Sequence, residues 1–86
     1  MTPLDAVLLA ALGHVVDAPD VEAGFERVKE LTGADFDFAS FRLALAAAIR
    51  RGLLLEPVRL PPGALHCHWR LELTPKGLAA ARAAAR

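Results

Sequence analysis

Residues 69–82, WRLELTPKGLAAAR, pass directly from an alternating pattern into an alanine-rich one. Up to Leu73, large apolar residues alternate with charged ones, which is typical of a β-strand that buries one face. Thr74 is a residue type that caps helix N-termini, and Pro75 suits the first turn, where its missing N–H would have no helical partner. The stretch therefore predicts a strand that leads straight into a helix, which is expected over about residues 75–85.

The residues before this strand predict its partner in a β-hairpin. Residues 53–60 form a short segment rich in branched apolar side chains. Pro-Pro-Gly-Ala at residues 61–64 separates it from residues 65–73. Pro57 cannot donate to a ladder, so the first strand is expected at an edge or in an irregular pairing. Along the second strand, the expected apolar face holds Leu65, Cys67, Trp69, Leu71 and Leu73, and the polar face holds His66, His68, Arg70 and Glu72.

Three helices are predicted before the hairpin, because apolar residues recur there at three-to-four spacing. They are expected over residues 3–12, 21–33 and about 38–51. Either Asp35 or Asp37 can cap the third helix, and residues 14–19 are interpreted as a connector between the first two. On the third helix, the expected core stripe is Phe38, Phe41, Leu45, Ala48 and Ile49, and the opposite side holds Ala39, Ser40, Leu43, Ala46, Ala47, Arg50 and Arg51.

Together these elements predict an α+β fold in a single domain, residues 1–86. Arg-Arg-Gly-Leu-Leu at residues 50–54 ends the third helix, and Leu-Thr-Pro-Lys-Gly at residues 73–77 joins the hairpin to the last helix. With this order of elements, the chain resembles the winged helix-turn-helix superfamily, in particular the bacterial multiple-antibiotic-resistance and phenolic-acid regulators. The places of that family's Leu-x-x-Leu-x-x-x-Gly-Leu pattern are occupied by Leu45, Ala48, Gly52 and Leu53.

The resemblance implies a small DNA-binding protein, a transcriptional regulator that acts as a homodimer. In that superfamily the third helix commonly enters the major groove, and the hairpin touches the DNA backbone or the minor groove. The DNA-binding residues implied here are Ser40, Arg42, Arg50 and Arg51 on the helix, with Arg59, His66, His68, Arg70 and Lys76 near phosphate. The same helix face also holds Leu43, Ala46 and Ala47, and apolar residues contact the thymine methyl group in base readout.

The charged residues are distributed unevenly along the chain, although the formal net charge is zero. Residues 1–37 hold eight acidic and two basic residues, whereas residues 38–86 hold two acidic and eight basic ones, so the halves carry net charges of −6 and +6. Asymmetry of this kind is one of the cues for an anionic partner. The basic half contains the third helix, the hairpin and the last helix, which favours double-stranded DNA as the partner.

A second hypothesis assigns the same surfaces to protein contact without DNA binding. The apolar stripe on the third helix comprises Ala39, Leu43, Ala46 and Ala47. An exposed apolar stripe usually marks an interface. The alanine-rich last helix has only Leu78 as a large apolar anchor, so we expect it to be weakly docked unless something else covers it. The alternative function is therefore a winged-helix protein-interaction module.

The sequence carries no signature of catalysis or of metal binding. It has no glycine-rich phosphate loop, nucleophile elbow or recognised metal-ligand spacing, so neither an enzyme nor a bound cofactor is expected. His66 and His68 share a strand face and could meet a metal together with His14. Cys67, however, is expected on the opposite, apolar face, so no metal site is predicted and Cys67 is assigned to the core.

Membrane insertion and secretion are also not expected. No apolar run approaches the roughly 20 residues that a membrane-spanning helix needs, and the N-terminus lacks a basic leader region. A single cysteine cannot form an internal disulfide, which fits a reducing compartment. The expected location is the cytoplasm.

Overall fold

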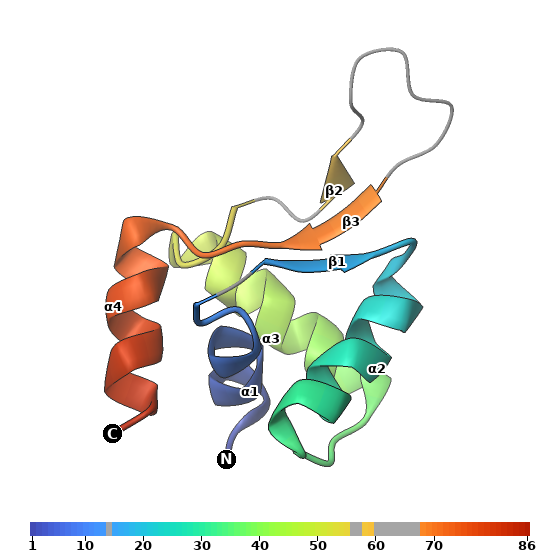
Figure 1. Cartoon of the computed structure of the whole chain (residues 1–86), viewed down its shortest axis with the longest axis horizontal. Coiled ribbons are helices and arrows are strands. Elements are labelled where there is room, and N and C mark those ends of the chain that lie inside the picture. The colour runs from blue at the N-terminus through green and yellow to red at the C-terminus, as the bar shows by residue number, and fades with distance from the viewer. Residues whose placement is uncertain (14, 56–57, 60–67) are drawn as a thin grey trace.

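The computed structural model describes residues 1–13, 15–55, 58–59 and 68–86, and for residues 58, 59 and 68 the backbone alone. These residues form an α+β arrangement of four helices and an antiparallel sheet that lies along one side of them (Figure 1). In chain order the elements are α1 (Pro3–Ala10), β1 (Val16–Ala18), α2 (Val21–Thr32), α3 (Phe38–Arg50), β2 (Val58–Arg59), β3 (His68–Leu71) and α4 (Pro75–Ala84). This arrangement is compatible with the winged-helix order that the sequence resembles.

The sheet has the strand order β1-β3-β2, so β3 lies in the middle and pairs antiparallel with both neighbours. In the β2–β3 pair, Val58 lies opposite Trp69. An isolated bridge between Leu54 and Leu73 extends the pairing toward α4. The segment that follows α3 is thereby held against the strand that precedes α4.

The predicted hairpin is found in part. Within the described residues, β2 covers Val58–Arg59 of the strand expected over residues 53–60, and β3 covers His68–Leu71 of the strand expected over residues 65–73. Trp69 and Leu71 are buried and Arg70 is exposed, as the alternation predicts. The predicted turn and six of the predicted strand residues, at positions 56, 57, 60 and 65–67, lie outside the described residues.

Strand β1 corrects the interpretation of residues 14–19 as a connector. Val16 and Ala18 are buried, whereas Asp17 is exposed, so this short segment alternates like a strand. Val16 lies opposite Leu71 of β3. Three residues are too few for alternation to stand out in a sequence, and the strand forms because β3 offers free backbone groups on that side.

The helix boundaries follow from their capping residues. Asp20 accepts a hydrogen bond of 2.8 Å from a backbone N–H in the first turn of α2, which ends at the left-handed Gly33 as predicted. At the start of α3 the cap is Asp37 and not Asp35, because Asp37 accepts a hydrogen bond of 2.7 Å from the Ser40 N–H. Helices α1 and α3 end slightly earlier than expected. None of the helices in the described ranges is long and apolar enough to cross a membrane.

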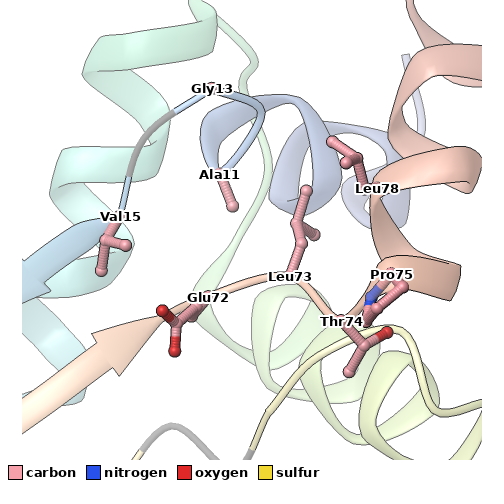
Figure 2. A pocket seen from close by; sticks show the side chains of 8 residues that line it. All are labelled: Ala11, Gly13, Val15, Glu72, Leu73, Thr74, Pro75 and Leu78. Carbon is pink, nitrogen blue, oxygen red and sulfur yellow. The ribbon is translucent and has the colours of Figure 1, made fainter.

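Helix α4 packs against α1, so another element covers the alanine-rich last helix. Ala81 is fully buried where these helices pack, and its small side chain lets them approach closely. The Thr74 hydroxyl accepts a hydrogen bond from the Gly77 N–H (3.0 Å) and donates one to the Gly52 carbonyl oxygen (2.6 Å). Thr74 therefore joins the start of α4 to the end of α3. Figure 2 shows Leu78 beside α1, one turn after Thr74.

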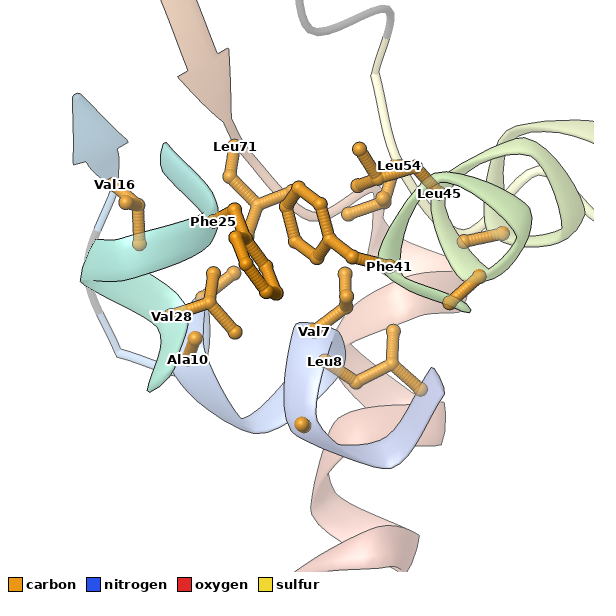
Figure 3. Packing of buried hydrophobic residues seen from close by; sticks show 14 of the residues in the cluster. Val7, Leu8, Ala10, Val16, Phe25, Val28, Phe41, Leu45, Leu54 and Leu71 are labelled. Atoms are coloured by element: carbon orange, nitrogen blue, oxygen red, sulfur yellow. The ribbon is translucent and has the colours of Figure 1, made fainter. Parts of the chain in front are cut away.

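The core lies between the helices and the sheet, and an aromatic cluster forms its centre (Figure 3). The Phe41 side chain of α3 is fully buried. Its ring centroid lies 5.2 Å from that of Phe25 and 6.2 Å from that of Trp69. The other large side chains buried most completely are Leu71, Val7 and Val28. The core therefore joins α1, α2 and α3 to the middle strand.

Helix α3 buries a narrower stripe than the sequence predicts. Its buried residues are Phe41, Ala44, Leu45 and Ala48. Ile49, expected in the core, is 38% exposed, and Phe38 is half-buried. At 3.6 residues per turn, Ile49 lies about 80° around the helix from Phe41, so it falls at the edge of the buried face. Ala44 takes a core position on the other edge.

Candidate interaction surface on helix α3

The side of α3 that points away from the core is open to solvent. Its exposed residues are Ala39, Arg42, Leu43, Ala46, Arg50 and Arg51, and Ser40 and Ala47 are half-buried. Leu43 lies near the middle of the helix and is 72% exposed. A contiguous exposed apolar area, unlike a scattered apolar residue, is a feature of contact surfaces. We call this area the α3 surface.

The α3 surface is hollowed on both sides of Leu43. One hollow, of about 410 Å³, is lined by Ala39, Arg42, Leu43 and Ala46. The other, of about 340 Å³, is lined by Leu43 and Ala44 together with Ser40, Thr2, Pro3 and Leu4. Leu43 therefore forms a ridge between two shallow hollows, and the second hollow extends the surface onto the start of α1.

The two ends of α3 carry opposite charges. Asp35 and Asp37 lie at the N-terminal end, and Arg50 and Arg51 lie at the C-terminal end. Each sign is placed favourably for the helix macrodipole. The ion pairs between described residues join Arg27 to Glu30, Lys29 to Glu26 and Arg70 to Asp17. Within the described ranges, the arginines of α3 are thus available to an external partner.

The pKa of Asp37 is lowered by Ser40, first through the Ser40 side chain and then through its backbone N–H. The Ser40→Ala variant should therefore raise the pKa of Asp37 toward its ordinary value, as measured by NMR titration of the carboxyl carbon. Because the folded pKa is depressed, this group stabilises the fold above about pH 4, and that contribution is lost as the pH falls through the lowered pKa. Ala46→Ser, elsewhere on α3, is the control. An unchanged Asp37 pKa in Ser40→Ala would contradict the contribution of the Ser40 side chain and leave the backbone N–H as the cause.

The other residues implied in DNA binding are spread over the sheet and α4. Arg70 on β3 lies beside a carboxylate, because its Nε atom is 3.4 Å from Asp17 Oδ1 of the neighbouring strand. Lys76 is exposed in the first turn of α4. Arg59 and His68 lie opposite each other in the β2–β3 backbone register, and their side chains are outside the described part of the structure, as is the whole of His66.

A third concave region, of about 390 Å³, lies between the end of α1 and the start of α4 (Figure 2). Its lining is mostly apolar, and Glu72 is the charged residue in it. The Thr74 hydroxyl in this lining is already hydrogen-bonded to Gly52 and Gly77. Among the described residues, no group of three histidine, cysteine or acidic side chains is placed to hold a metal ion. The lining therefore offers packing surface and no nucleophile paired with a base.

Two features of these surfaces were not recognised in the sequence. Thr2, Pro3 and Leu4 extend the α3 surface, but only the packing of α1 beside α3 brings them there. The contact of Arg70 with Asp17 depends on the pairing of β1 with β3, and the exposed acid between two apolar residues is the local signal for it.

Comparison of the chain with models of protein families, with curated proteins and with solved structures found no match.

Proposed function

We propose that the chain is a winged-helix domain that uses the α3 surface for protein contact. The observation that carries this proposal is the exposed Leu43 between two hollows, at the centre of the helix face that the fold leaves open. The residues around it are small, so a partner can approach the helix backbone closely and cover Leu43. Because Leu43 is so exposed, burying its side chain under a partner contributes a large favourable free energy to binding.

The same surface is poorly suited to reading DNA bases. Base edges are recognised mainly by arginine, asparagine, glutamine, lysine and acidic side chains, whereas the centre of this face holds leucine and alanine. Asp35 and Asp37 at the N-terminal end of α3 would repel phosphate. The charge of Arg70 is partly neutralised by its neighbour Asp17. These features favour protein contact over the DNA-binding hypothesis.

DNA binding remains the second candidate function, because the surface also carries three exposed arginines. Arg42, Arg50 and Arg51 lie on the open side of α3 and form no ion pair with another described residue. Arginines of this kind contact phosphate in many complexes. A homodimeric regulator would present two copies of these three arginines to the DNA.

Fluorescence anisotropy with a labelled random 30-base-pair duplex separates the two functions. Protein contact as the function predicts no binding tighter than about 10 µM at low salt. Binding that is tighter, weakens steeply with added salt and is lost in the Arg50→Ala/Arg51→Ala double variant would overturn the proposal in favour of DNA binding. Arg82→Ala on α4 is the control for a general loss of positive charge.

A further inference from the structure

We draw no further inference here: the strongest candidate, the mostly apolar concave region between the end of α1 and the start of α4 (Figure 2), carries none because nothing in the structure shows what covers it.

Discussion

Phe41→Ala is expected to lower the free energy of unfolding by about 4 kcal/mol, which is most of the stability of many small domains. The Phe41 side chain is fully buried, and its ring packs against Phe25, Phe36, Phe38 and Trp69. These aromatic partners come from three segments of the chain, so they cannot all move inward to fill the space that the ring leaves. The cavity therefore persists and adds to the lost transfer free energy.

Urea unfolding followed by circular dichroism measures this loss. Leu43→Ala is the matched control, because it truncates a large apolar side chain two residues away on the same helix. Leu43 is exposed, so its truncation should change the free energy of unfolding by less than about 0.5 kcal/mol. If Phe41→Ala does not fold, Phe41→Leu gives the measurement, with an expected loss of about 1.5 kcal/mol. Equal stabilities for the Phe41 and Leu43 variants would show that the aromatic cluster is not the centre of the core.

Gly77→Ala should destabilise the protein by about 3 kcal/mol, although alanine is the better helix former. Gly77 lies in the first turn of α4, directly against the backbone of Leu53. A Cβ atom at this position would overlap the Leu53 carbonyl oxygen and lie 2.8 Å from the Leu53 carbonyl carbon. The obstruction is backbone, so α4 or the segment after α3 must move, and the hydrogen bond from Thr74 N to Leu53 O (3.1 Å) would be strained with it.

Thermal unfolding provides the readout, with an expected fall in Tm of roughly 12–24 °C for a chain of this size. Ala79→Gly, on the exposed side of the same helix, is the control for helix propensity and should cost about 1 kcal/mol. The two substitutions are the reverse of each other, so propensity alone predicts opposite signs. A Gly77→Ala variant that is more stable than the wild type would rule out the close contact with Leu53.

The local signals in the sequence predicted much of the fold. Thr74 caps α4 as expected, Gly33 ends α2, and the alternation after Trp69 matches the burial along β3. Each of these features depends on hydrogen bonds or spacing within a few residues. The side of α3 that faces solvent was predicted for the same reason, because a helical period assigns a face to every residue.

Other features were wrong or were missed where distant segments decide the outcome. The residues that form β1 were predicted to be a connector, and they form a strand because they pair with β3. Ile49 has the apolar character of a core residue but lies at the edge of the buried face of α3 and is 38% exposed. The ion pair of Arg70 with Asp17, 53 residues earlier in the chain, was missed because it depends on the pairing of β1 with β3.

By itself the sequence determined where the helices start, which face of α3 is free and that opposite charges lie at its two ends. Capping, helical period and charge order are properties of neighbouring residues, and they act before any tertiary contact forms. Only the tertiary structure decided that Leu43 stands between two hollows, that α1 widens the surface and that α4 is held on α1 through small residues. Burial and close packing depend on which distant segments meet, and no local pattern contains that information.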